Sequence, residues 1–313
     1  MRMTPSKIHA PALLLALVTL SVVPRHPASA QSGRLPKDER KSEQPAQTQP
    51  PTFLKPLIRR LTPRRELKRL GYGGSVTIDG APEGSVTVEA WSRSEVEVTA
   101  EVEQSADTEE NLTRLAALNT FTVDEDVNHV RVLTVGLHDR KYAKRAAKGL
   151  PKHLPAMPWR IDYRVKVPAA CDLEINAGRG ALVVSGVEGG LRINAGGGPD
   201  TLFALSGGDV EATLAAGPVT VRPAARSWRG RGLRLRLVSG DLTVELPAGF
   251  SGDVDAEVLR AGRIENAYPG LAPRERTTPT ERALQARAGN GGATLSFTVG
   301  DGTLRIRQAG SRQ

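Results

Sequence analysis

Short runs in which apolar and polar residues alternate recur along most of the chain. In residues 95–103, Val96, Val98, Ala100 and Val102 alternate with polar side chains. An extended segment with this pattern has one apolar side and one polar side. Comparable segments occur at residues 74–79, 85–91, 121–124 and 130–135. The pattern predicts β-strands as the main element.

The second half of the chain contains a sequence repeat. Residues 173–180 and 191–198 nearly copy each other at an offset of 18 residues, and weaker copies follow. Short strands that end in glycines at a regular period are typical of strands stacked by repetition. Strand cores are expected at 173–176, 182–185, 191–194, 210–214, 219–222, 233–238, 242–246, 254–258, 294–299 and 304–307.

These patterns together predict an all-β fold of stacked short strands similar to a β-solenoid. Each strand has only a few apolar side chains, so it is stable only when it is stacked on its neighbours. An antiparallel β-sandwich is the alternative. One short helix is expected over residues 107–119, because Asp107 can cap its N-terminus and Leu112 and Leu115 lie on one apolar stripe.

The N-terminus has the features of a secretory signal peptide. A basic start precedes an apolar run at residues 10–23, and Ala28–Ala30 fits a cleavage site before Gln31. The apolar run is shorter than the ~20 residues that a membrane-spanning helix needs, although an uncleaved anchor is the alternative. We therefore expect residues 1–30 to be removed and the mature protein to be periplasmic, attached to the cell surface or secreted.

The chain has one cysteine, Cys171, far from the expected cleavage site. It therefore has no cysteine in place for a lipid anchor, so we do not expect a lipoprotein, and no disulfide can form within the chain. Cys171 stands in an apolar sequence context without a matching histidine and acid pattern. We interpret it as a small, partly buried apolar residue.

A segment rich in proline and glutamine follows the signal peptide. Residues 31–65 have little apolar periodicity, which predicts a disordered basic linker. Leucines and arginines are interspersed at irregular spacings over residues 57–70. This stretch is a candidate amphipathic helix for peripheral membrane contact, and a solvated helical arm is the alternative. The domain of strand repeats is expected at residues 66–310.

The formal charge of +9 and the pI of about 10.0 predict attraction to polyanions. Residues 138–153 form a basic insertion, and a second basic run follows Trp228. The candidate polyanion-binding residues are Lys141, Lys144, Arg145, Lys148, Arg229, Arg231, Arg234 and Arg236. Solvated surface charge is the alternative for the insertion. We expect no nucleic-acid partner, because aromatic residues are not interleaved with the basic strands.

We find no catalytic, metal or cofactor motif in the sequence. Acids on neighbouring strands could form a row of carboxylates. Enzymes that cleave polysaccharides by acid catalysis need two carboxyl groups at a defined distance. Solvated strand acids are the alternative. The residues concerned are Glu174, Asp209, Glu211, Asp241, Glu245, Asp253 and Asp255.

Several of the repeated segments resemble a known family. The segments at residues 173–176, 182–186 and 191–193, together with 239–247 and 300–306, are similar to the bacterial putative-adhesin family, also called domain of unknown function 4097. The resemblance covers about residues 71–310. It implies a repetitive all-β fold, an envelope or extracellular setting and no established catalytic residues.

The sequence therefore favours an exported, non-catalytic binding or adhesion module. The expected partners are anionic envelope polymers or other proteins, and no cofactor is expected. The alternative is a carbohydrate-active β-helix enzyme that acts on acidic polysaccharides.

Overall fold

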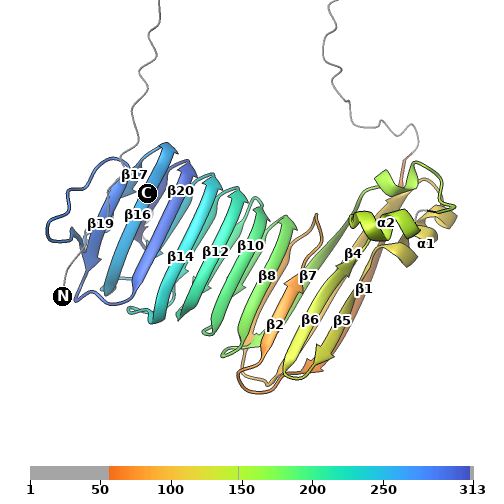
Figure 1. Cartoon of the computed structure of the whole chain (residues 1–313), viewed down its shortest axis with the longest axis horizontal. Coiled ribbons are helices and arrows are strands. Elements are labelled where there is room, and N and C mark those ends of the chain that lie inside the picture. The colour runs from red at the N-terminus through yellow and green to blue at the C-terminus, as the bar shows by residue number, and fades with distance from the viewer. Residues whose placement is uncertain (1–55, 147, 311–313) are drawn as a thin grey trace, which may run out of the picture. The chain divides into compact units, whose positions relative to one another are not determined.

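The computed structural model describes residues 56–146 and 148–310 (Figure 1). The expected signal peptide and residues 31–55 of the expected linker lie outside the described residues. Within the described part, no helix has the length and apolar character needed to cross a bilayer. The described chain is mostly β-structure, as predicted.

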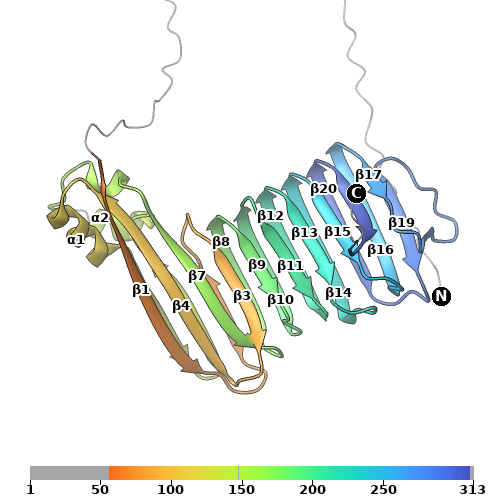
Figure 2. The same ribbon diagram turned by 180° about the vertical axis from the view of Figure 1, so that it is seen from behind.

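The strands form two large sheets. Sheet A, seen in Figure 2, has the spatial order β1 (Ile58–Arg69), β4 (Glu95–Ala106), β7 (Trp159–Pro168), β3 (Val86–Trp91), β9 (Leu182–Ser185), β11 (Thr201–Leu205), β13 (Val219–Pro223), β15 (Leu242–Leu246), β21 (Leu304–Gln308) and β17 (Ile264–Asn266).

Sheet B faces the viewer in Figure 1. Its order is β18 (Leu271–Pro273), β19 (Ala283–Ala288), β16 (Gly252–Ala261), β20 (Thr294–Asp301), β14 (Arg229–Ser239), β12 (Gly207–Ala216), β10 (Gly190–Gly197), β8 (Asp172–Arg179), β2 (Ser75–Asp79), β6 (His129–Val135) and β5 (Thr120–Asp126).

The repeating unit is a coil that contributes one strand to each sheet. The coils are β2/β3, β8/β9, β10/β11, β12/β13, β14/β15, β16/β17 and β20/β21. Strands of neighbouring coils pair in parallel, with Leu173 opposite Leu191 and Asn176 opposite Asn194. The sequence repeat is thus one coil, and the predicted stack of short strands is confirmed. Antiparallel pairs occur near the ends of the sheets, where β4 pairs with β1 and β7, β5 with β6, and β19 with β16 and β18.

The core lies between the two sheets and consists of aliphatic rows. On sheet B, one inward row carries Ile78, Ile175, Ile193, Leu235 and Phe297, all nearly inaccessible to solvent. Burial of each such side chain contributes about 1.5–3 kcal/mol. Because the residues of a row come from successive coils, no single coil has a core of its own.

A column of glycines stacks at one corner of the coils. A Cβ atom on any of them except the first would overlap the carbonyl oxygen of the preceding glycine in the column. A side chain here would push the coils apart, so glycine permits their close approach. The column contains, in spatial order, Gly84, Gly180, Gly198, Gly217, Gly240, Gly302 and Gly262.

The last coil of the chain is inserted out of sequence order. Strand β20 lies between β14 and β16, and β21 lies between β15 and β17. Ion pairs connect this coil to the coils on both sides. They are Arg260–Asp301, Arg305–Asp241 (2.9 Å), Arg305–Glu265 (3.0 Å) and Arg307–Glu245 (2.7 Å).

These ion pairs predict that acid destabilises the fold. The hydrogen bond from Arg260 lowers the pKa of Asp301, and bonds from the Thr303 N–H and then Arg305 lower the pKa of Asp241. Because the folded state holds both carboxylates ionised, their contribution to the free energy of unfolding is complete above the usual aspartate pKa of 3.8. This contribution is lost as the pH falls through the lower pKa of each group in the folded state. The melting temperature should fall over this range.

The measurement is the melting temperature as a function of pH, with Asp301→Asn as the matched variant. This variant should melt at a lower temperature at neutral pH and lose less stability on acidification, because one of the titrating groups is absent. A melting temperature that stays constant for both proteins between about pH 5 and about pH 2 would contradict this prediction.

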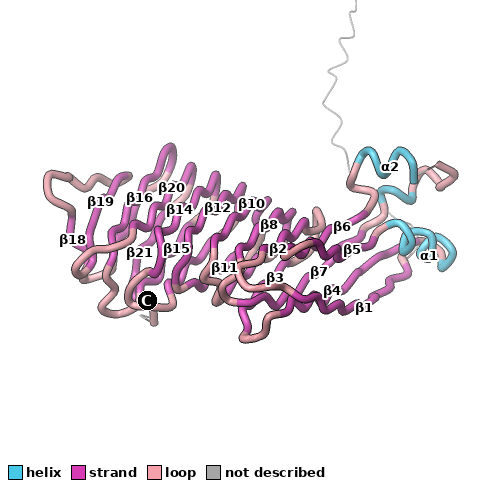
Figure 3. Tube along the Cα trace, turned by 60° about the horizontal axis from the view of Figure 1, so that its bottom comes forward, coloured by secondary structure: helices cyan, strands magenta, loops and turns pink. Residues whose placement is uncertain are grey.

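The helices pack at one end of the sheets, beside β1, β4, β5 and β6 (Figure 3). Helix α1 (Glu109–Leu118) confirms the predicted helix, and Leu112 and Leu115 are buried as expected. The cap differs by one residue, because the hydroxyl of Thr108, not the side chain of Asp107, accepts a hydrogen bond from the Asn111 N–H. Asp107 instead accepts from the Asn111 side chain.

The predicted helix at residues 57–70 is wrong. Residues 58–69 form β1, an edge strand that pairs with β4 along its whole length. The last residues of the expected linker therefore belong to sheet A. The arginines suit this position, because charged side chains on an edge strand oppose pairing with other chains.

Candidate functional site

The outer face of sheet B carries two neighbouring hollows of about 310 and 350 Å³. The first lies over β6, β2, β8 and β10, and the second over β12, β14 and β20. Asp209 lines both. We call the two hollows together the sheet B trough. The residues that line it belong to seven neighbouring strands, in the order β20, β14, β12, β10, β8, β2 and β6. Figure 1 shows this order of strands.

Two outward rows of side chains form the sheet B trough. The first row runs through His129, Ser75, Asp172, Gly190, Asp209, Gly232 and Thr294. The second runs through Thr77, Glu174, Arg192, Glu211, Arg234 and Ser296. Glycine, serine and threonine occupy six of these 13 positions. Small residues therefore leave the hollows between the longer charged side chains.

The Ser75 hydroxyl and Nδ1 of His129 form a hydrogen bond of 2.7 Å at one end of the trough. On β8, the other neighbour of β2, Asp172 lies opposite Ser75. The Asp172 carboxylate accepts a hydrogen bond from the Gly190 N–H. The Ser75 and Asp172 N–H groups bind carbonyl oxygens. These three backbone donors are thus already used, so none of them can stabilise an oxyanion.

The arrangement of this cluster differs from that of a Ser–His–Asp triad. Asp172 is bonded to backbone and does not orient His129, as the third member of a catalytic triad does. The hydroxyl, the imidazole and the carboxylate can each hydrogen-bond a ligand. The sequence analysis missed the cluster because Ser75 is 54 residues from His129 and further from Asp172.

Most of the predicted basic run lies in or beside the trough. Arg234 and Arg236 project outward from β14 on either side of buried Leu235, as expected. However, Arg229 pairs with Glu188, Arg231 with Asp209 (3.5 Å) and Arg234 with Glu211 (3.8 Å). Among the described residues, Arg236 has no ion-pair partner within 4 Å. The run is therefore largely neutralised by acids from the preceding coils.

The possible row of carboxylates does not form, and the alternative of separate strand acids fits the structure. Glu174 lies on β8, whereas Asp253 and Asp255 lie on β16, and four strands of sheet B lie between β8 and β16. Asp241 directly precedes β15 of sheet A, and Glu245 lies on β15. Six of the seven acids pair with arginine. The pairs are Asp209–Arg231, Glu211–Arg234, Asp241–Arg305, Glu245–Arg222, Asp253–Arg287 and Asp255–Arg274.

The lowered pKa values of Glu245 and Asp241 also oppose general-acid catalysis by these two groups, because a general acid needs a raised pKa. Burial raises the pKa of Glu245, but hydrogen bonds from Arg222 and Arg307 outweigh it and leave the pKa lowered. Hydrogen bonds from the Thr303 N–H and from Arg305 lower the pKa of Asp241. Both groups therefore stay ionised at neutral pH.

The basic insertion lies apart from the arginines of β14. Helix α2 (Arg140–Ala146) contains Lys141, Lys144 and Arg145, and Lys148 follows it. The helix comes after β6, which is separated from β14 in sheet B by β2, β8, β10 and β12. The structure thus divides the predicted polyanion-binding residues into two groups, one at the helical end and one beside the trough.

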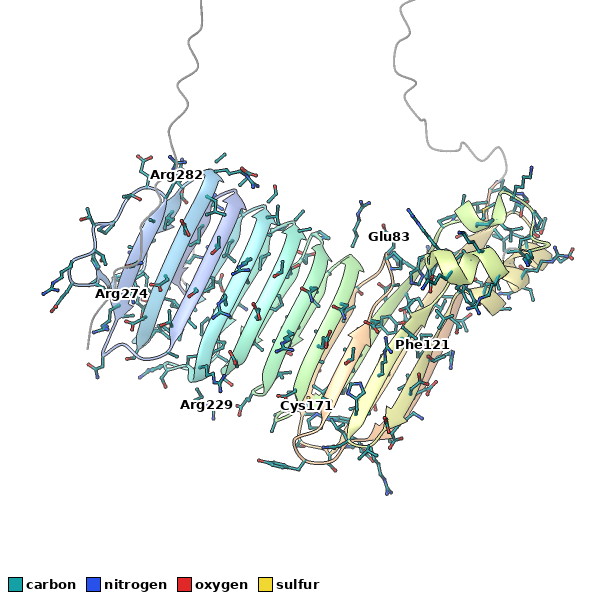
Figure 4. All side chains as sticks on the ribbon, in the orientation of Figure 1. Glu83, Phe121, Cys171, Arg229, Arg274 and Arg282 are labelled. Atoms are coloured by element: carbon teal, nitrogen blue, oxygen red, sulfur yellow. The ribbon has the colours of Figure 1, made fainter. Side chains whose placement is uncertain are left out.

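Cys171 is buried at a turn before β8, as its apolar sequence context predicts (Figure 4). Burial raises the pKa of the thiol to about 12, so the thiol remains protonated at neutral pH. A protonated, buried thiol is a poor nucleophile.

The described residues are close to neutral in charge. They contain 34 lysines and arginines and 31 aspartates and glutamates, so most of the +9 charge lies in residues 1–55 and 311–313. The attraction to polyanions that the whole sequence predicts is therefore weak on the sheets themselves.

The fold places this chain in the class of two-sheet β-solenoids. No protein-family model and no curated protein matches the sequence. One solved structure that it resembles is a putative cell adhesion protein from Clostridium sporogenes, with 11% sequence identity and a TM-score of 0.41 over 79% of this chain and 100% of that chain. Another is a putative adhesin from Bacteroides fragilis, with 10% identity and a TM-score of 0.26 over 79% of this chain and 97% of that chain. A putative lipid binding protein from Parabacteroides distasonis is also similar, with 9% identity and a TM-score of 0.23 over 78% of this chain and 96% of that chain.

Proposed function

We propose that this protein is an exported, non-catalytic module that binds an extended polymer along the sheet B trough. The observation that carries the proposal is the continuity of the two hollows, which share Asp209 and cross successive coils. Neighbouring strands are about 4.8 Å apart, so the trough offers similar polar groups at a short, regular spacing. A chain of repeating units can follow such a surface. The signal-peptide pattern of residues 1–30 supports export.

The polar groups of the trough favour a hydroxyl-rich polymer, that is, a polysaccharide. Carboxylates at Asp172, Glu174 and Asp209 accept hydrogen bonds from sugar hydroxyls, and Arg192 and Arg231 donate to them. Acids and arginines alternate along the second row. A strongly anionic polymer would meet repulsion from every second charged position, so a neutral or weakly acidic polysaccharide fits best.

Blocking the trough should abolish this binding. Thr77→Trp and Ser296→Trp place large side chains in the two hollows at partly exposed strand positions, where aromatic residues are well tolerated. Thr243→Trp on the outer face of sheet A is the matched control. We expect each trough variant to lose at least about tenfold in affinity, or about 1.4 kcal/mol, and the control to lose none.

The measurement is calorimetric titration with neutral polysaccharides (dextran, galactomannan) and acidic ones (alginate, heparin). Equal binding by the trough variants and the control would contradict the proposal, as would a failure to bind any polymer. Binding of the acidic polymers alone, weakened by salt and by Arg236→Gln but not by Thr77→Trp, would instead indicate the polyanion stripe that the sequence suggests.

A further inference from the structure

Three turns meet at one corner of the coils and border an open, shallow hollow of about 350 Å³. The turns are residues 70–73 between β1 and β2, 91–94 between β3 and β4, and 168–171 between β7 and β8. We call this hollow the corner site. Its wall is mostly small and apolar, and Cys171 marks its position in Figure 4.

Tyr72 extends from the first of these turns into solvent. Its side chain is 97% exposed, whereas Tyr163 and Tyr268 are buried. The turn itself is held in place, because the Asn128 side chain donates a hydrogen bond to the Tyr72 carbonyl oxygen (3.4 Å). An aromatic ring that is left in water on an anchored turn is typical of a binding surface, since aromatic rings provide large contact areas with few rotatable bonds.

Trp91 lines the same hollow and is firmly positioned. Its Nε1–H donates to the Glu95 carbonyl oxygen (2.8 Å). The Arg93 guanidinium lies 5.1 Å from the centre of the indole ring, within the range of a cation–π interaction. Arg93 forms no ion pair within 4 Å among the described residues and lines the hollow, although its charge also acts on Glu97.

We propose that the corner site binds a pyranose ring that carries a carboxylate, that is, an acidic sugar. The exposed ring of Tyr72 contacts the apolar C–H face of the sugar, while Trp91, with Arg93 and Lys166 beside its ring, lines the hollow, and Arg93 pairs with the carboxylate. The volume of the hollow is at the lower end of the range of small-molecule sites, which suits one or two sugar rings. This site is separate from the sheet B trough and does not depend on it.

The test is ligand-observed NMR of the mature full-length protein with a galacturonate trimer and with the neutral galactose trimer as the comparison. The wild-type protein should bind the acidic trimer at least about tenfold more tightly than the neutral one. Tyr72→Ala should lose about tenfold in affinity for the acidic trimer, and Arg93→Gln should remove the preference for it over the neutral trimer.

Two control variants separate this proposal from other effects. Tyr142→Ala removes a partly buried tyrosine from α2 and should bind normally. Thr77→Trp blocks the trough and should also bind the trimer normally, so failure at one site does not imply failure at the other. The proposal is overturned if the wild type binds neither trimer, if it binds both equally, or if Tyr72→Ala binds like the wild type.

Discussion

Replacement of Gly240 by alanine is expected to lower the free energy of unfolding by about 4 kcal/mol. The new Cβ atom would overlap the Gly217 carbonyl oxygen in the glycine column, and the backbone there has a φ of +134° that L-residues rarely adopt. The neighbouring atom is backbone on a paired coil, so it cannot move aside without breaking sheet contacts. Urea denaturation measures the loss.

Gly249→Ala is the matched control for this effect. Gly249 also has a positive φ, +69°, but a Cβ atom there would meet no atom within 4 Å. The free energy of unfolding of the control should fall by only about 1 kcal/mol, because alanine is strained in the left-handed backbone conformation. Similar losses in the two variants would show that backbone conformation, and not close approach between coils, explains the glycine column.

Removal of residues 294–313 is expected to prevent stable folding of the remaining chain. These residues include β20 and β21, each of which pairs with a strand on both sides. Their loss also exposes the core around five buried side chains, namely Leu295, Phe297, Val299, Leu304 and Ile306. At about 2 kcal/mol for each, the loss is about 10 kcal/mol, comparable with the whole stability of an ordinary domain.

Circular dichroism and limited proteolysis would detect this loss. In the full-length chain, Phe297→Ala should cost about 3–5 kcal/mol and leave the fold intact, which tests the same contacts without removing a strand. A truncated chain with a native spectrum and normal protease resistance would contradict the prediction. It would mean that β16 can pair directly with β14.

Most strands could be predicted because alternation and glycine spacing are local signals. The cores of β8, β10, β12 and β14 fall where the sequence places them. Strand β11 was missed because Leu202, Phe203, Ala204 and Leu205 form a continuous apolar run without alternation. The wrong helix at residues 57–70 has a similar cause, since irregularly spaced leucines and arginines fit either element until a pairing partner is known.

The order of the coils and the composition of the sites could not be predicted. Glycine and leucine patterns are nearly the same in every coil, so they do not indicate that β20 belongs beside β14. The ion pair between Arg234 and Glu211 depends on a register between residues 23 positions apart. The sequence showed the arginines on one face but not the acids that neutralise them. Tyr72 gave no periodic signal at all.

The position of β20 and β21 between earlier coils means that the two sheets can be completed only after these strands have been made. During synthesis from N-terminus to C-terminus, β14 and β16 are both made before the segment that belongs between them exists. A prematurely terminated product would keep unpaired edges and exposed leucines, which proteases and chaperones recognise readily.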